Sequence, residues 1–289
     1  MCTNMANVFI FIFDVVKDSF MISFPTPMVK KFQLHNSINR CLWEECKHPQ
    51  IISYIPLFFV LRNMAYINAA FRSSKDHEVY FFMKNKYVRV HYTPGKSDDT
   101  ILTNLSLISS GFPVFKGTLF AEPGIDCSFN TEGSEAYVFS TNQSANLEYT
   151  PDAPNDRILS GPATIAEIFP VLKNTVFEDG IDSAFRSTIG KEVYIFKYNQ
   201  YTCIDYDSKQ LVANIRKIVD GFPVLRGTIF ENGIDASFAS HEEAEAYLFK
   251  EDKYVRIKFT PHTTNTVLLS DIKPIIDGWP CLKDILPVT

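Results

Sequence analysis

Ile181-Asp182-Ser183-Ala184-Phe185 is one of four similar stretches that decide the fold of this 289-residue chain. The other three stretches begin at Ile67, Ile125 and Ile234. The intervals between successive stretches, counted from their second residues, are 58, 56 and 53 residues. Recurrence at a nearly constant interval of this length is the sequence signature of a repeat architecture.

Two further blocks accompany each opening stretch in the same order. Glu78-Val79-Tyr80-Phe81-Phe82 follows the first, and its counterparts begin at Glu135, Glu192 and Glu245. Each copy closes on a common phrase: Gly111-Phe112-Pro113-Val114, Ile168-Phe169-Pro170-Val171, Gly221-Phe222-Pro223-Val224 and Gly278-Trp279-Pro280-Cys281. Three blocks repeated four times indicate four copies of one unit between about residues 66 and 286.

The pattern within one copy predicts short strands and one short helix. The apolar opening block and the block rich in aromatic and β-branched residues each predict a strand, with a polar hairpin loop at 72–77 between them. The alternating stretch 87–92 predicts a third, half-exposed strand that ends at Thr93-Pro94-Gly95. Residues 103–110 predict a short helix stopped by Gly111 and Pro113, with matching stretches at 212–220 and 270–277.

Such a unit cannot bury both faces of its small sheet alone, whereas four units around an axis can. We therefore expect an all-β fold, a four-bladed β-propeller with a short helix per blade. The expected blades span about 66–120, 121–177, 178–230 and 231–286.

Residues 1–65 read differently from the repeats. They hold three of the six cysteines and five of the six methionines, and their apolar runs show no clear period. We expect no independent core in this segment. It is predicted to be an N-terminal extension that is docked or disordered, or a segment that does not belong to the mature protein.

Composition and motifs exclude several classes of function. The net charge of −5 disfavours nucleic-acid binding, which needs clustered basic residues. No apolar run reaches the length of a membrane span. The six cysteines show neither paired nor zinc-type spacing, which predicts free thiols in a reducing compartment. No nucleophile elbow, zinc-protease motif, phosphate loop or dinucleotide fingerprint is present, so we do not expect an enzyme.

The repeat blocks resemble the hemopexin repeat, which forms four-bladed propellers. Their residues resemble more closely still those of the legume seed albumin-2 group of hemopexin-fold proteins. An example is the stretch Tyr66-Ile67-Asn68-Ala69-Ala70-Phe71-Arg72-Ser73-Ser74. The resemblance covers about 66–286. It implies a cytosolic protein of seed cells, closed by packing and channel ions rather than by a disulfide.

The resemblance also implies a calcium ion in the central channel, held by main-chain carbonyls. The matching positions are Asn68, Asp126, Asp182 and Asp235. Ca²⁺ accepts such oxygens, and four inner strands supply them at equal radius. For a single Asp at a strand start, the simpler interpretation is a turn cap. Residues two further on repeat the same orientation and could form a second ring for sodium or chloride: Ala70, Ser128, Ala184 and Ser237.

Albumin-2-like proteins are associated with binding spermine and haem, and the sequence offers candidates for both ligands. Four glutamates at the start of the second strand could ring one mouth of the channel and attract spermine, which could bridge a homodimer: Glu78, Glu135, Glu192 and Glu245. Alternatively, each is a solvated residue or is paired with a neighbouring blade. His77 and His241 lie in equivalent loops and are the candidate haem ligands, although most loop histidines are merely solvated.

Three functions remain open. The first is a ligand-binding seed albumin that senses or buffers polyamine and haem, with a link to oxidative stress and polyamine metabolism. The second is a nitrogen reserve, which can coexist with the first. The third is a protein-binding propeller without a small-molecule role.

Overall fold

The computed structural model describes residues 10–14, 19–23, 29–33 and 66–288. The chain divides into two units, Met1–Tyr54 and Ile55–Thr289. In the first unit, β1 (Ile10–Asp14), β2 (Ser19–Ser23) and β3 (Val29–Gln33) form an antiparallel sheet in that order. The expectations for 1–65 fall mainly outside the described residues and stay predictions. No helix in the described ranges is long and apolar enough to cross a membrane.

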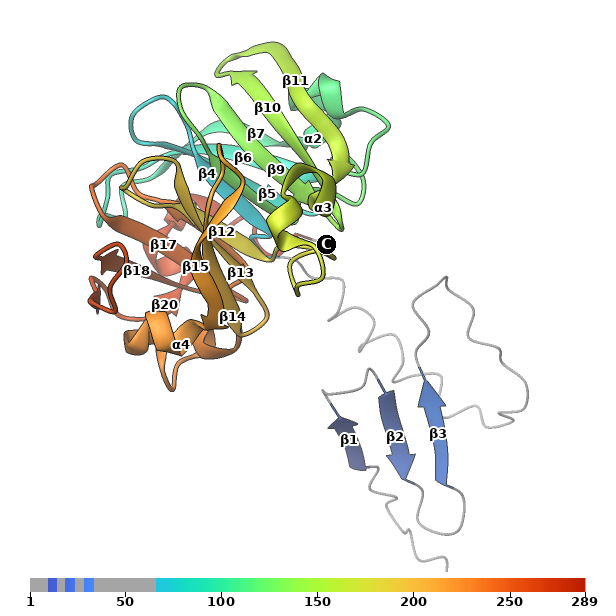
Figure 1. Ribbon diagram of the computed structural model, residues 1–289. Coiled ribbons are helices and arrows are strands. Elements are labelled where there is room, and N and C mark those ends of the chain that lie inside the picture. Colours follow the sequence, from blue (N-terminus) through green and yellow to red (C-terminus); the bar gives the residue numbers. More distant parts are fainter. Residues whose placement is uncertain (1–9, 15–18, 24–28, 34–65, 289) are drawn as a thin grey trace, which may run out of the picture. The chain divides into compact units, whose positions relative to one another are not determined.

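The second unit consists of four antiparallel sheets, one for each sequence copy (Figure 1), which confirms the four-bladed propeller. Blade 1 runs from β4 to β7, blade 2 from β8 to β11, blade 3 from β12 to β15, and blade 4 from β16 to β20. The inner strands are β4 (Ala69–Arg72), β8 (Cys127–Asn130), β12 (Ser183–Arg186) and β16 (Ala236–Ala239). They come from the opening stretches.

Three further layers of strands follow outward in each blade. The second strands are β5 (Glu78–Met83), β9 (Glu135–Ser140), β13 (Glu192–Lys197) and β17 (Glu245–Lys250). The third strands are β6 (Lys86–His91), β10 (Gln143–Thr150), β14 (Gln200–Asp205) and β18 (Lys253–Phe259). The outer strands are β7 (Thr100–Leu107), β11 (Ala153–Thr164), β15 (Gln210–Lys217) and the short β19 (Thr266–Leu268), with β20 (Lys273–Pro274) also paired to β18.

The predicted helices were too long. Most of 103–110 and of 212–220 belongs to the outer strands β7 and β15, and only four residues in each copy are helical. These helices are α2 (Ile108–Gly111), α3 (Ile165–Ile168), α4 (Ile218–Gly221) and α5 (Ile275–Gly278). Each is stopped by the aromatic-proline phrase, because proline begins a short 3₁₀ turn: η1 (Pro113–Phe115), η2 (Pro170–Leu172), η3 (Pro223–Leu225) and η5 (Pro280–Leu282). Another turn, η4 (Ile229–Asn232), follows in blade 3.

The third strands are more buried than predicted, because neighbouring blades cover both of their faces. Residues 87–90 of β6 are all buried: Val88 and Val90 belong to the blade 4–blade 1 cluster, and Tyr87 belongs to the blade 1–blade 2 cluster. The residues of β7 are exposed or half-exposed, and its sequence, which contains Ile101, Leu102, Leu105 and Leu107, does not alternate strictly between apolar and polar residues. An edge strand of this kind is easily mistaken for a helix when it is read only from its sequence.

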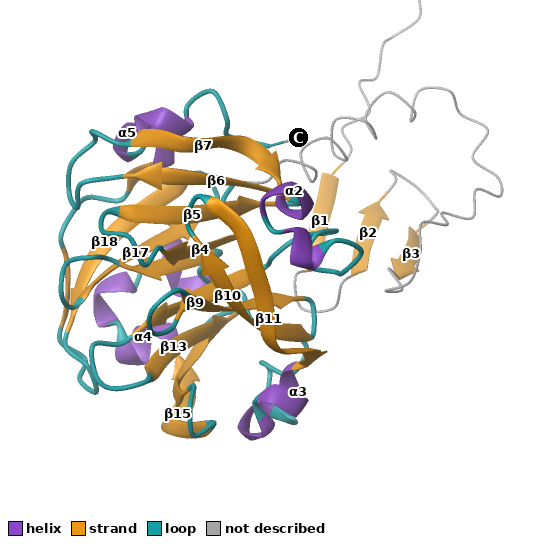
Figure 2. Ribbon diagram, turned by 90° about the horizontal axis from the view of Figure 1, so that it is seen from above, coloured by secondary structure: helices purple, strands orange, loops and turns teal. Residues whose placement is uncertain are grey.

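The four inner strands lie side by side in a closed ring, in which β4 contacts β8, β8 contacts β12, β12 contacts β16, and β16 contacts β4. Figure 2 shows the blades grouped about a common centre, with α2, α3 and α5 at the periphery. The ring closes where blade 4 meets blade 1, so the beginning and the end of the propeller share one interface. No disulfide contributes among the described residues, since Cys127, Cys203 and Cys281 are free thiols.

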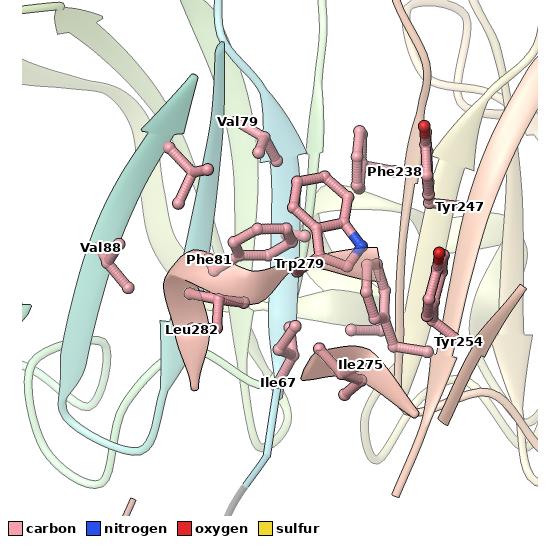
Figure 3. Packing of buried hydrophobic residues seen from close by; sticks show 14 of the residues in the cluster. Ile67, Val79, Phe81, Val88, Phe238, Tyr247, Tyr254, Ile275, Trp279 and Leu282 are labelled. Carbon is pink, nitrogen blue, oxygen red and sulfur yellow. The ribbon is translucent and has the colours of Figure 1, made fainter. Parts of the chain in front are cut away.

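Aromatic side chains fill the interfaces between blades. The blade 4–blade 1 cluster surrounds Trp279, whose ring centroid lies 5.0 Å from that of Phe81 and 5.4 Å from that of Tyr247 (Figure 3). Ile67 and Val288, from opposite ends of the propeller, are buried in the same cluster. Stacked and edge-on rings at these separations stabilise beyond their area burial.

The closing phrase shows how neighbouring positions adjust to each other. Glycine at positions 111, 221 and 278 leaves room for a tyrosine of the third strand, and any Cβ there would collide with that ring. Blade 2 has Ile168 instead of glycine, and its third strand has the small Ser144 instead of tyrosine. In blade 2, a serine–isoleucine pair therefore replaces the tyrosine–glycine pair of the other three blades.

Candidate functional site

The four opening residues are held by the same two hydrogen bonds. The backbone N–H of Asp126 donates to the Phe139 carbonyl at 2.8 Å, and its Oδ2 accepts the Thr141 backbone N–H at 2.7 Å. The equivalent turn donors, which like Thr141 have positive φ, are Lys84 for Asn68, Tyr198 for Asp182 and Glu251 for Asp235. The side chains therefore act as turn caps, the alternative considered for a single Asp.

This capping leaves the main-chain carbonyls of the four residues available. Within residues 66–288, no hydrogen bond is made to the carbonyl oxygen of Asn68, Asp126, Asp182 or Asp235. Asn68 serves as well as Asp, because its amide oxygen accepts the same turn N–H. Calcium coordination by these carbonyls stays a prediction.

Charge at this end of the channel is largely compensated. Lys197 donates to Asp182 at 2.7 Å, and Lys250 donates to Asp235 at 2.9 Å. Burial raises the pKa of Asp126, and the charge of Asp182 adds to the rise. Asp126 and Asp182 belong to adjacent blades, so the strand starts of these blades lie close enough to interact electrostatically.

The proposed second ring lies deeper and is fully buried: Ala70, Ser128, Ala184 and Ser237. The hydroxyls of Ser237 and Ser183 bond to each other across blades 3 and 4. The Ser128 hydroxyl has no hydrogen-bond partner in the described part of the chain. A buried hydroxyl without a partner costs free energy, so a water or an ion beside it would be stabilising. The identity of any such ion stays a prediction.

The predicted glutamate ring requires a correction. All four glutamates do begin second strands, but their side chains do not stand free at a mouth. Glu78 lies on the same strand face as Tyr80 and Phe82, which pack between blades 1 and 2. Each glutamate therefore faces the interface between two blades, here called a groove, because alternate residues of a strand share one face. Pairing with a neighbouring blade was the alternative interpretation of these glutamates. Spermine binding by them stays a prediction.

Each groove contains one basic side chain near its glutamate or the neighbouring tyrosine. Arg89 Nε lies 3.5 Å from Glu78, and Arg256 Nε lies 3.7 Å from Glu245; both arginines come from third strands. The other two bases come from the loop after the third strand of the following blade: Lys209, whose Nζ donates to Tyr137 Oη at 2.6 Å, and His262, whose Nε2 lies 2.7 Å from Glu192 Oε2.

The tips of these loops were missed by the sequence analysis. All four have positive φ and contact the preceding blade: Gly95, Asp152, Lys209 and His262. Asp152 pairs with Arg89, and the Gly95 N–H donates to Tyr247 Oη at 3.0 Å. The signal was available, because three of the tips directly follow the Thr-Pro phrase that ends the third strand.

The structure brings His77 and His241 together across blades 1 and 4, with ring centroids 5.8 Å apart. His91 joins them, at 6.1 Å from His77. His241 Nδ1 hydrogen-bonds with Tyr92 Oη at 2.9 Å, while its buried Nε2 has no partner among the described residues. Burial, and next the charge of Arg72, lower the pKa of His241 to about 4. The predicted pair is therefore adjacent, and its role in haem binding stays a prediction.

Acidification should destabilise the protein through His241. Its folded-state pKa is lowered from an ordinary value near 6.5 to about 4, so the unfolded chain binds more protons between these values. The free energy of unfolding therefore falls as the pH falls from 6.5 to 4. Melting temperatures of the wild type and of His241→Gln should converge below pH 6. An identical pH profile for the two proteins would contradict this assignment, and His91→Gln, at an exposed position, is the matched control.

Comparison with known proteins agrees with this geometry. No family model matches the chain. A hemopexin-fold protein from cow pea is 71% identical, with 77% of this chain and 99% of that chain covered at a TM-score of 0.76. A plant lectin with two metal binding sites from Cicer arietinum is 52% identical, with 78% and 100% covered at the same TM-score. The fold and its similarity to the cow pea protein thus define a hemopexin-fold propeller.

Within that class, the similarity extends to curated sequences. Albumin-2 of Lathyrus sativus is 49% identical over 224 residues, which are 77% of this chain and 98% of the relative. The chain belongs to the legume seed albumin-2 family.

Proposed function

We propose that this seed albumin is a cation-binding propeller whose channel holds calcium on four main-chain carbonyls. The proposal rests on a hydrogen-bond pattern that recurs in all four blades. The side chain at the start of each inner strand accepts a turn N–H, and the main-chain carbonyl of the same residue has no hydrogen bond: Asn68, Asp126, Asp182 and Asp235. The four residues are exposed or half-exposed, so a cation can reach their free carbonyls, and a hard cation coordinates such oxygens readily. A related lectin is described as having two metal binding sites, which supports a metal here.

Calcium removal should lower the melting temperature of the protein by roughly 5–10 °C. A ligand present at about 100 times its Kd stabilises the folded state by about 2.7 kcal/mol, and a domain of this size shifts by about 2–4 °C per kcal/mol. Differential scanning calorimetry before and after exhaustive chelation measures this shift. Readdition of calcium should reverse it.

Asp182→Asn separates carbonyl from carboxylate coordination. Asparagine keeps the cap to the Tyr198 N–H, as Asn68 does in blade 1, so the variant should retain calcium. Loss of calcium from this variant would show that carboxylates hold the ion. An unchanged melting temperature after chelation of the wild type would remove the structural ion altogether.

Haem is a second candidate ligand, and one specific observation favours it. His241 presents an unpartnered Nε2 beside His77 on loops of adjacent blades. A neutral imidazole is the form that ligates iron, and burial keeps His241 neutral at physiological pH. The change in the Soret band of added hemin should be lost in His241→Ala and retained in His262→Ala.

Polyamine binding and a spermine-bridged homodimer belong to the same proposal, with a revised location. The grooves hold the four glutamates, and in three of them a lysine or arginine lies close to the glutamate or its neighbouring tyrosine. A cationic ligand would therefore favour the groove that has no such side chain. Sedimentation with and without spermine tests the assembly state.

A further inference from the structure

Blades 1 and 4 show which chemical group the grooves accommodate. In blade 1 the Arg89 guanidinium lies beside the buried Glu78 carboxylate and 5.9 Å from the centre of the Tyr80 ring. In blade 4 the Arg256 guanidinium approaches Glu245 in the same way. The recurring feature is a guanidinium beside a carboxylate that is buried in blade 1 and half-buried in blade 4, and in blade 1 the guanidinium also lies over an aromatic ring.

Blade 3 has the same environment without the arginine. Cys203 pairs with Tyr194 in the register in which Arg89 pairs with Tyr80 and Arg256 with Tyr247. The shorter side chain leaves a small cavity between blades 3 and 4. Its lining includes Cys203, Tyr194, Phe222 and Phe259, with His262 at its edge.

Glu192 does not line the cavity itself but lies behind two of its lining residues, Cys203 and His262, and supplies the nearest negative charge. Its residue is only 8% exposed, and its Oε2 lies 3.9 Å from Cys203 Sγ and 2.7 Å from His262 Nε2. His262 is the one basic partner of Glu192 among the described residues, and its side chain is 46% exposed. Arg216 also lines the cavity, but it is solvent-exposed and stacks over Tyr201 rather than pairing with Glu192. Its positive charge weakens the attraction of the cavity for a cation, and its contact with water reduces this repulsion.

We propose that the groove between blades 3 and 4 is a binding site for a small guanidinium compound. The guanidinium takes the place that Arg89 and Arg256 occupy in blades 1 and 4, with Glu192 as counter-charge and Tyr194 as the ring beneath it. The cavity is water-sized and His262 forms part of its lining, so binding requires His262 to rotate outward and make room, which its exposure permits. The site is separate from the channel, and its existence does not depend on the calcium ion.

Methylguanidinium at millimolar concentration is the probe. It should raise the melting temperature of the wild-type protein by mass action, whereas tetramethylammonium, which has the same charge and no N–H donors, should not. In Cys203→Arg the protein supplies its own guanidinium, so the rise should disappear. Glu192→Gln should also lose the rise, while Cys203→Ala, which keeps the cavity open, should retain it.

The remaining variants separate this site from unspecific effects. Cys127→Ala removes the other fully buried thiol, in the blade 2–blade 3 interface, and should respond like the wild type. The melting temperature of His262→Ala should rise at a lower methylguanidinium concentration, because no imidazole has to rotate out of the cavity. An equal response in the wild type and Cys203→Arg would overturn the site. A rise with tetramethylammonium that is as large as the rise with methylguanidinium would overturn its restriction to guanidinium.

Discussion

Replacement of Trp279 by alanine should lower the free energy of unfolding by about 3–5 kcal/mol. Trp279 is 2% exposed and lies in the blade 4–blade 1 cluster beside Phe81 and Tyr247 (Figure 3). Its ring centroid also lies 5.3 Å from that of Tyr92. This interface closes the ring without a disulfide. Truncation leaves a cavity at the place where the first and last blades must hold together.

The control for this prediction is supplied by the other blades. Phenylalanine occupies the equivalent position in them, at 112, 169 and 222, so Trp279→Phe should cost much less than alanine. The indole N–H also has no partner in the described structure, and its loss is not penalised. Urea unfolding measures both variants. Equal losses for Phe and Ala would show that volume at this position does not control closure.

Replacement of Arg89 by methionine should be the second large effect, with a loss of about 3–5 kcal/mol. The Arg89 side chain is 7% exposed and lies against Glu78, while Asp152 of blade 2 binds it from the opposite side. Methionine fills similar space but leaves the Glu78 carboxylate buried without its cation. The cost is therefore the uncompensated charge rather than a cavity.

The double variant Arg89→Met, Glu78→Gln isolates this charge. It should recover much of the stability lost in the single variant, because neither charge remains buried. Arg157→Met is the matched control, since Arg157 forms its pair with Glu148 on the surface, and no measurable loss is expected. Additive losses in the double variant would show that Arg89 and Glu78 do not interact.

Most of the propeller was predictable from the repeats, because three blocks in fixed order specify where the inner strand, the second strand and the closing turn lie. The outer strands were not predictable from local pattern. Their residues are exposed or half-exposed at the sheet edge, and their sequences do not alternate strictly between apolar and polar residues, so neither carries the sequence pattern of a half-buried strand. Pairing with the third strand, a nonlocal interaction, decides their conformation.

The sequence predicted the positions of the candidate site residues but not the contacts that they make. The positions of Asn68, Asp126, Asp182 and Asp235 follow from the opening stretch, and the adjacency of His77 and His241 follows from ring closure. The direction of the glutamates was missed, because their neighbours come from another blade. In some grooves the basic side chain comes from the third strand, as Arg89 does, and in others it comes from a loop tip, as Lys209 and His262 do. This difference is visible only when the blades are compared in the structure.

The most direct test of the calcium channel is crystallography with anomalous diffraction on crystals grown in calcium. The account predicts an anomalous peak on the channel axis, ringed by the main-chain carbonyl oxygens of Asn68, Asp126, Asp182 and Asp235 at about 2.3–2.6 Å. The four side chains should still bond to their turn amides. A channel without a peak at this level, or a cation bound by the carboxylates instead of the carbonyls, would contradict it.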